Sequence, residues 1–114
     1  MSHDEDVVTM LVLTNAMRKR WKRGMFTLDA GLSMLAAERA DNMAVSGDLL
    51  HIKGGPAENI GFGFESPEDA LKGWMNSPDH RDNIVNKEHT HIGIGVSVSD
   101  GVAWWCVLFV AGKH

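Results

Sequence analysis

The stretch H-I-G-I-G-V-S-V-S-D-G-V-A-W-W-C-V-L-F-V, residues 91–110, has the clearest strand pattern in the chain. From Ile92 to Val98 an apolar β-branched residue stands at every second position, the period of a strand that buries one face. The Asp100-Gly101 pair is typical of a tight hairpin turn, and residues 102–110 are almost entirely apolar. The sequence therefore predicts an antiparallel hairpin here.

Two helices are predicted upstream of the hairpin. Apolar residues recur at helical spacing from Glu5 to Trp21, and a second apolar stripe runs from Leu32 to Met43. Thr27 or Asp29 is a favoured N-cap for the second helix, and Gly47 is a favoured terminator. Helices that come first and strands that come last predict an α+β domain, with the helices packed on a small antiparallel sheet.

The segment between residues 48 and 63 is predicted to be a loop, because four glycines and a proline interrupt it. Both His51 and Glu58 lie in this segment, and loops held by a rigid scaffold often carry functional side chains. A third strand is predicted around residues 60–64, although its glycines are unfavourable in a strand.

Two short helices are predicted by one repeated start signal. Ser66-Pro67-Glu68-Asp69 and Ser77-Pro78-Asp79 each offer a hydroxyl N-cap, a proline for the first helical position and a carboxylate for the positive helix end. The second of these helices carries His80 in its first turn, which gives the ring a defined direction. The positive helix end disfavours imidazolium, so we expect a neutral ring, the form that binds metals.

Composition is typical of one globular domain spanning residues 1–114, with 44% hydrophobic and 23% charged residues. The formal net charge of -4 argues against binding to nucleic acid. The basic run from Arg18 to Arg23 is interpreted as a solvated helix end in preference to a nucleic-acid or lipid-headgroup contact.

The single cysteine, Cys106, excludes an internal disulfide and is predicted to be a buried, inert thiol in a strand. No apolar run approaches the roughly 18 residues of a membrane span. The chain opens M-S-H-D-E-D, which is acidic where a secretory signal is basic. These features predict no transmembrane segment and no signal peptide, and they leave the localisation open.

Motifs spread over most of the chain resemble the CAP superfamily of cysteine-rich secretory proteins, antigen 5 and pathogenesis-related 1 proteins. The resemblance is to its short, cysteine-poor bacterial or phage-type members, and it depends on the order and spacing of the motifs together. The motifs are N-A-M-R at 15–18, L-D-A-G-L at 28–32, A-x-x-R-A at 36–40, G-D-L-L-H at 47–51, E-N-I at 58–60, W-M-N-S-P-D-H-R-D-N-I at 74–84, T-H-I-G-I-G-V at 90–96 and the strand with Trp104-Trp105.

This resemblance implies a three-layer α-β-α sandwich, in which a small antiparallel sheet is flanked by about four helices. It also implies a groove with two histidines and two glutamates, whose histidines can take a divalent metal such as zinc. His51 matches the first histidine, Glu58 the first glutamate and His80 the second histidine, whereas Ser77 stands where the family has its second glutamate. The expected groove is therefore His51, Glu58, Ser77 and His80, with His51 and His80 as ligands of a weakly bound Zn²⁺ or other divalent cation.

Several carboxylates are candidates to replace the missing glutamate, namely Asp79, Glu65 and Glu68. Two alternatives to a metal site also remain open from the residues alone. His51 is equally suited to tying loop turns together, and Glu58 to accepting backbone N–H groups in a glycine-rich loop.

A second histidine pair, His89 and His91, would share one face of a strand. That pair is interpreted as a solvent-facing strand edge in preference to a metal site.

Three functions remain open. The favoured one is a binding module without turnover, since family members bind sterols, fatty acids, other small apolar molecules or partner proteins. The second is a metal-assisted peptidase in which Glu58 is the general base, with Glu58 and His80 as candidate catalytic residues and with His51 and His80 holding zinc. The third is a non-catalytic interaction domain. Family members are mostly extracellular, and the sequence leaves the oligomeric state open.

Overall fold

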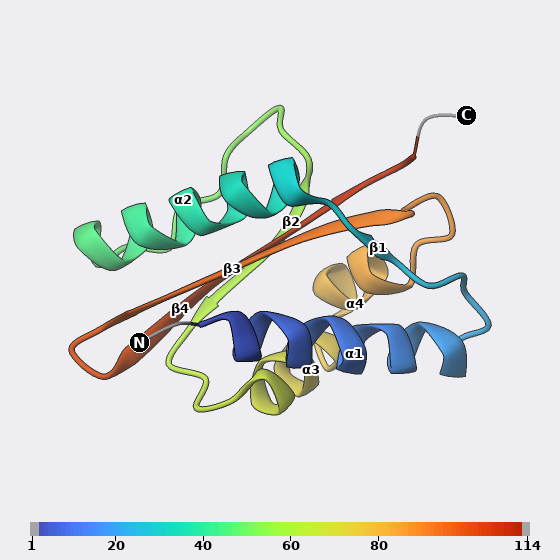
Figure 1. The fold of residues 1–114 in the computed structure, drawn as a ribbon, viewed down its shortest axis with the longest axis horizontal. Coiled ribbons are helices and arrows are strands. Elements are labelled where there is room, and N and C mark those ends of the chain that lie inside the picture. Colours follow the sequence, from blue (N-terminus) through green and yellow to red (C-terminus); the bar gives the residue numbers. More distant parts are fainter. Residues whose placement is uncertain (1–2, 113–114) are drawn as a thin grey trace.

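The structure is a computed structural model that describes residues 3–112. One sheet lies between two layers of helices, so the fold has three layers (Figure 1). The elements in chain order are α1 (Asp4–Arg20), β1 (Thr27–Leu28), α2 (Ala30–Ser46), β2 (Ala57–Phe62), α3 (Pro67–Met75), α4 (Pro78–Val85), β3 (His91–Ser99) and β4 (Val102–Val110). The fold is α+β, as predicted.

The four strands lie in the order β1-β3-β4-β2. The predicted hairpin is confirmed, because β3 and β4 pair antiparallel from His91 opposite Val110 to Ser99 opposite Val102. A third strand is also present, but it spans 57–62 and not the predicted 60–64; β2 runs antiparallel to β4 and forms one edge of the sheet. The two-residue strand β1 was not predicted, and it pairs parallel to β3, so the sheet is mixed and not purely antiparallel.

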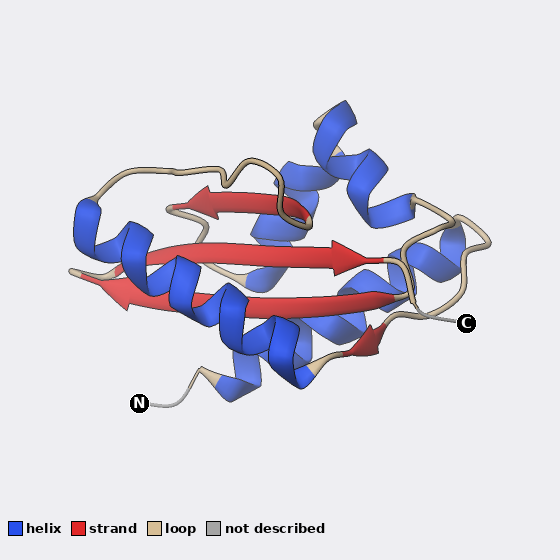
Figure 2. Ribbon diagram, turned by 90° about the horizontal axis from the view of Figure 1, so that it is seen from above, coloured by secondary structure: helices blue, strands red, loops and turns tan. Residues whose placement is uncertain are grey.

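One face of the sheet is covered by α2, and the other by α1, α3 and α4 (Figure 2). On the α2 side, Gly93 and Gly95 of β3 let the helix lie directly on the strand. A Cβ atom added to Gly95 would come within 2.3 Å of the Ala37 backbone nitrogen, and one added to Gly93 within 2.4 Å of the Leu32 carbonyl carbon. Asp29 begins this helix by accepting a hydrogen bond from the Leu32 N–H at 2.7 Å.

The opposite face is filled by large side chains. Trp105 and Phe109 of β4 pack there with Met10 of α1 and Ile84 of α4 in one buried cluster. Trp74 of α3 joins this cluster and donates its indole N–H to the Ile60 carbonyl at 3.2 Å. Bulky side chains thus separate these three helices from the sheet.

Arg18 corrects the interpretation of the basic run as a solvated helix end. Its side chain is 2% exposed and donates to the carbonyls of Ile84, Asn86 and His89 at 2.7 to 3.0 Å. The guanidinium therefore joins the end of α1 to the segment that follows α4. Lys19 and Arg20 are exposed, so the interpretation holds for them.

The thiol of Cys106 is buried in β4 on the α2 side, as predicted. Burial, and secondarily the charge of Glu58, raise the pKa of Cys106 to about 12. Within residues 3–112, no helix combines the length and the apolar character needed to cross a bilayer.

Candidate functional site

Glu58 lies in the edge strand β2, and this corrects its predicted position in a loop. The glycines that follow it favour a loop locally, but pairing with β4 across the whole of 57–62 holds the segment extended. The side chain of Glu58 is only 6% exposed and points to the α2 side of the sheet, where Arg39 donates to Oε2 at 3.0 Å. A buried carboxylate needs such a partner, because an unpaired buried charge is strongly destabilising.

The other carboxylate oxygen of Glu58 fixes the loop that carries His51. Oε1 accepts a hydrogen bond from the Ile52 N–H at 2.9 Å and lies 2.8 Å from Nδ1 of His51. Since a carboxylate can only accept, Nδ1 of His51 carries the proton and Nε2 keeps its lone pair. The His51 side chain is 61% exposed, so this lone pair is open to solvent.

Asn59 secures the second histidine on the opposite side of the same strand. Its side chain donates to the His80 carbonyl at 3.0 Å and accepts from the Asn83 amide at 2.9 Å. Because successive side chains of a strand point to opposite faces, Glu58 reaches α2 and the His51 loop while Asn59 reaches α4. These two adjacent residues of β2 thus bring both predicted histidines to one edge of the sheet.

Ser77 stands at the N-cap position of α4, but its hydroxyl makes no capping hydrogen bond. Instead, Oγ lies 3.0 Å from Nδ1 of His80. The predicted side-chain cap is therefore wrong, although the predicted start of the helix is right. The hydroxyl fixes the orientation of the imidazole and leaves Nε2 as the ring nitrogen without a hydrogen bond among residues 3–112.

The electrostatic environment of His80 favours the predicted neutral ring. Burial first, and then the nearby charge of His51, lower the pKa of His80, while the charge of Asp79 opposes this shift. The repulsion by His51 means that the two imidazoles lie in the same electrostatic neighbourhood.

A pocket of about 290 Å³ adjoins this histidine pair at the edge of β2. Ser77 and His80 form its polar part, and the remaining wall is mostly apolar. That wall consists of Leu49, Ile60, Gly61, Phe62, Phe64, Gly73 and Trp74. The pocket can therefore hold an apolar group beside an imidazole.

Three site residues had no predicted role. Arg39 holds Glu58, Asn59 holds α4, and Phe62 stacks on Trp104 with ring centroids 4.9 Å apart. The signal for Arg39 was available, because it is a charge within the apolar stripe of the second helix, and a charge there indicates a buried partner.

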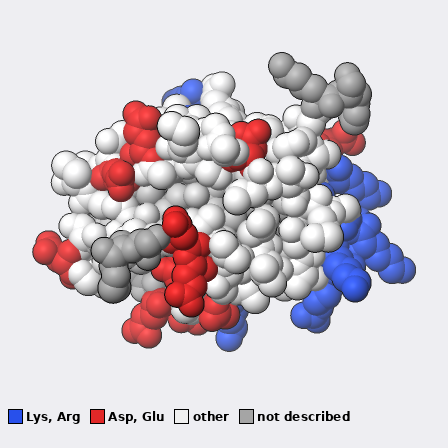
Figure 3. Space-filling view, viewed as in Figure 1, with Lys and Arg blue, Asp and Glu red and all other residues white. Residues whose placement is uncertain are grey.

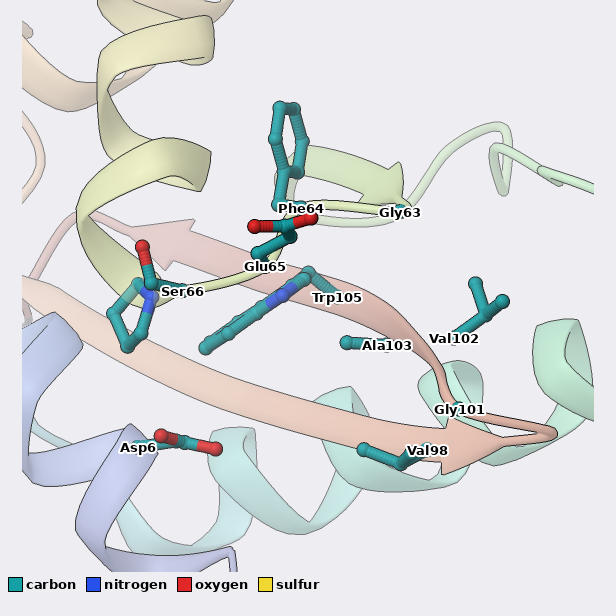
Figure 4. Close-up of a pocket in the computed structure, with 11 residues that line it drawn as sticks. Asp6, Gly63, Phe64, Glu65, Ser66, Val98, Gly101, Val102, Ala103 and Trp105 are labelled. Atoms are coloured by element: carbon teal, nitrogen blue, oxygen red, sulfur yellow. The ribbon is translucent and has the colours of Figure 1, made fainter.

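The remaining candidates lie elsewhere. His89 precedes the strand, with Nδ1 2.8 Å from the Asn83 carbonyl and its ring stacked on Phe109, so it shares no strand face with His91. Glu65 lines a separate pocket (Figure 4). Among residues 3–112, no group of three or more His, Cys, Asp or Glu side chains is arranged to hold a metal ion. Any metal at the histidine pair would have two protein ligands.

Comparisons with known proteins agree with this fold. Residues 11–109 match the model of the cysteine-rich secretory protein (CAP) family. Uncharacterized protein YkwD of Bacillus subtilis (strain 168) is 34% identical over 109 residues, covering 81% of this chain and 42% of that protein. The chain spans less than half the length of the curated relatives that it matches.

Solved structures show the same fold at lower identity. An outer surface protein from Borrelia burgdorferi has a TM-score of 0.89 and 20% identity, covering 99% of this chain and 97% of that one. NaASP2 with Zn²⁺ has a TM-score of 0.76 and 16% identity, covering 96% of this chain and 80% of that one.

Proposed function

This chain belongs to the cysteine-rich secretory protein (CAP) family, and from that premise we propose that it binds a small apolar or lipid-like molecule in the pocket beside His80. The observation that carries the proposal is the composition of the pocket wall. Aromatic and aliphatic side chains form most of it, and the polar groups are confined to Ser77 and His80. Ligand pockets commonly combine such an apolar wall with a few orienting polar groups.

The surroundings of the pocket extend its apolar surface. Leu49, Leu50, Ile52 and Phe62 are each between 43% and 55% exposed, and Leu49 and Phe62 also line the pocket. Exposed apolar side chains grouped at a pocket favour an apolar ligand over a sugar or a nucleotide.

The state of Glu58 favours binding over hydrolysis. Its two oxygens are engaged by Arg39, His51 and the Ile52 N–H, and the side chain is nearly fully buried. A general base must reach the proton that it removes. Glu58 acts in this proposal as a positioning residue for His51, so the peptidase alternative gains no support from this arrangement.

We also propose that a weakly bound divalent cation is held by the Nε2 atoms of His51 and His80, the ring nitrogens that Glu58 and Ser77 leave free. The Glu58 carboxylate on Nδ1 of His51 is the partner that commonly orients a metal-binding imidazole. With two protein ligands, the remaining positions fall to water or to the ligand, so affinity is low and exchange is fast. When bound, the cation supplies positive charge for a carboxylate or hydroxyl head group. The presence of Zn²⁺ in the NaASP2 structure supports this part of the proposal.

Titration with cis-parinaric acid, a fluorescent fatty acid, tests the pocket. We expect saturable binding, and we expect Leu49→Asp to weaken it about tenfold, because a charge replaces an apolar wall. Val45→Asp is the matched control, since Val45 is an apolar side chain that is 89% exposed and lies outside the pocket wall. Equal binding by the Leu49→Asp protein and the parent protein would contradict the proposal.

Calorimetric titration of untagged protein with Zn²⁺ tests the metal. His51→Ala and His80→Ala should each lower the affinity about tenfold or more, and His91→Ala should leave it unchanged. If neither histidine variant changes zinc or fatty-acid binding while both lose about 1 to 3 kcal/mol of unfolding free energy, the cluster is structural and the interaction-domain alternative stands.

A further inference from the structure

Trp105 has a buried hydrogen-bond donor without a partner. The residue is 1% exposed, and its indole Nε1 has no hydrogen-bond acceptor among residues 3–112. Trp74, in the same buried cluster, donates its indole N–H to a backbone carbonyl. A buried donor left unpaired costs about 1 to 3 kcal/mol, so such donors are rare, and a bound molecule is one way to complete them.

This indole lines a second pocket, of about 310 Å³, at the hairpin-turn end of the sheet. Its wall comes from the loop between β2 and α3, from the turn between β3 and β4, and from the first turns of α1 (Figure 4). Phe64 is the one lining residue that this pocket shares with the pocket beside His80. The second pocket is therefore a distinct site.

Two carboxylates flank the indole. Figure 4 shows Glu65 over the ring on one side and Asp6 on the other side of the pocket. Neither carboxylate is ion-paired or hydrogen-bonded through its side chain to a residue in the described range. Figure 3 shows acidic side chains gathered at the end of the molecule where α1 begins, whereas lysines and arginines gather where α1 ends. The field at this pocket attracts cations.

The apolar part of the wall limits the type of cation. Phe64, Val98 and Val102 line the pocket together with the nearly buried Trp105. Aromatic faces attract organic cations, and the buried N–H requires an acceptor oxygen on the same molecule. A bare metal ion offers no acceptor for the indole, and an anion would be repelled by both carboxylates.

We propose that this pocket binds a primary ammonium group with a carbonyl oxygen beside it, the chemistry shared by an amino-acid amide and the N-terminal residue of a peptide. The carbonyl accepts the Trp105 N–H, the ammonium lies between Asp6 and Glu65, and a side chain contacts Phe64 and the valines. The volume is at the lower end of the range for ligand pockets, which suits one or two residues.

The test follows the indole N–H resonances of the four tryptophans in ¹⁵N-labelled protein during titration with leucinamide. We expect a saturable downfield shift of the Trp105 resonance alone, with a Kd of about 1 mM or tighter. N-acetylleucinamide lacks the ammonium and isoamylamine lacks the carbonyl, so each should bind at least about threefold more weakly. The peptide Leu-Gly-Gly separates the two sources: affinity at least equal to that of leucinamide identifies a peptide N-terminus, and lower affinity identifies a small amide.

Charge variants test the same site without disturbing the core. Glu65 is exposed, so Glu65→Gln should fold normally and weaken leucinamide binding about threefold, and the Asp6→Asn/Glu65→Gln double variant about tenfold. Glu68→Gln, an exposed carboxylate outside the pocket wall, is the control and should have no effect. A Trp105 resonance that leucinamide does not move, or equal binding of all three small probes, would overturn the proposal.

Discussion

The helices pack on the two faces of the sheet in different ways. Under α2, the glycines of β3 bring helix and strand backbones into direct contact, with no space between them. Under α1, α3 and α4, large aromatic side chains lie between the helices and the sheet. Each of the two pockets that Phe64 lines includes one of these side chains, Trp105 in one and Trp74 in the other. The face under α2 therefore tolerates few substitutions, whereas the face under the other three helices leaves pockets at its edges.

The largest predicted effect comes from disrupting the close contact between α2 and β3. Gly95→Ala places a methyl group within 2.3 to 2.5 Å of the backbone of α2, so the helix must move away from the strand. We expect a loss of about 3 kcal/mol or more of unfolding free energy, measured by urea denaturation. Gly24→Ala is the control, since nothing lies within 4 Å of its added Cβ, and its effect should stay within about 0.5 kcal/mol. Equal stability of the two variants would show that α2 is not in contact with β3.

On the opposite face, Arg18→Met leaves the carbonyls of Ile84, Asn86 and His89 without their shared donor. The apolar replacement keeps most of the side-chain volume, so the expected loss of about 2 to 3 kcal/mol comes from the unpaired carbonyls. Lys19→Met, at the exposed neighbouring position, should be nearly neutral. A loss below about 0.5 kcal/mol for Arg18→Met would mean that water replaces the guanidinium at no cost.

At the strand edge where the two faces meet, Glu58→Gln removes the charge that Arg39 and His51 share. Because Arg39 is also nearly buried, we expect the unfolding free energy to fall by about 2 kcal/mol, together with a loss of zinc affinity. Glu38→Gln changes an exposed carboxylate on the same helix as Arg39 and controls for net charge. If Glu58→Gln binds zinc as tightly as the parent protein, the Glu58 carboxylate does not orient His51 for metal binding.

The smallest effect concerns pH. The pKa of His80 is lowered in the folded protein, so the unfolded chain binds a proton more readily, and stability must fall as pH decreases below about 6.5. The parent protein should therefore lose more unfolding free energy than His80→Gln between about pH 7 and about pH 5, measured in EDTA. Parallel pH profiles would contradict the lowered pKa.

The sequence predicted the elements whose signals are local. The hairpin followed from the alternation in β3 and from Asp100-Gly101, where both residues adopt positive φ, of 52° and 76°. In contrast, β1 has two residues and depends on backbone hydrogen bonds to the segment that begins β3, from Thr27 to Thr90 and from Asp29 to Ile92. No property of the two β1 residues themselves could have predicted that pairing.

For the candidate site, the sequence motifs named residues but did not show how they are held in place. His51, Glu58, Ser77 and His80 came from motifs, whereas the contacts that bring them together depend on Arg39 and Asn59. These contacts join segments between 19 and 21 residues apart in the chain, and spacing alone does not determine such distances in space. Burial of Arg18 was missed for the same reason, because three of its acceptors, which its terminal nitrogens reach, lie 66 to 71 residues away.

The single thiol of Cys106 gives this molecule an internal reporter of transient opening. With the sulfur fully covered and its pKa raised to about 12, an alkylating reagent at neutral pH reacts only when β4 leaves the sheet. Because each molecule carries one thiol, the rate of labelling measures how often the folded protein opens at β4, and no dye or mutation is required. Any compound that holds the folded state should slow the labelling.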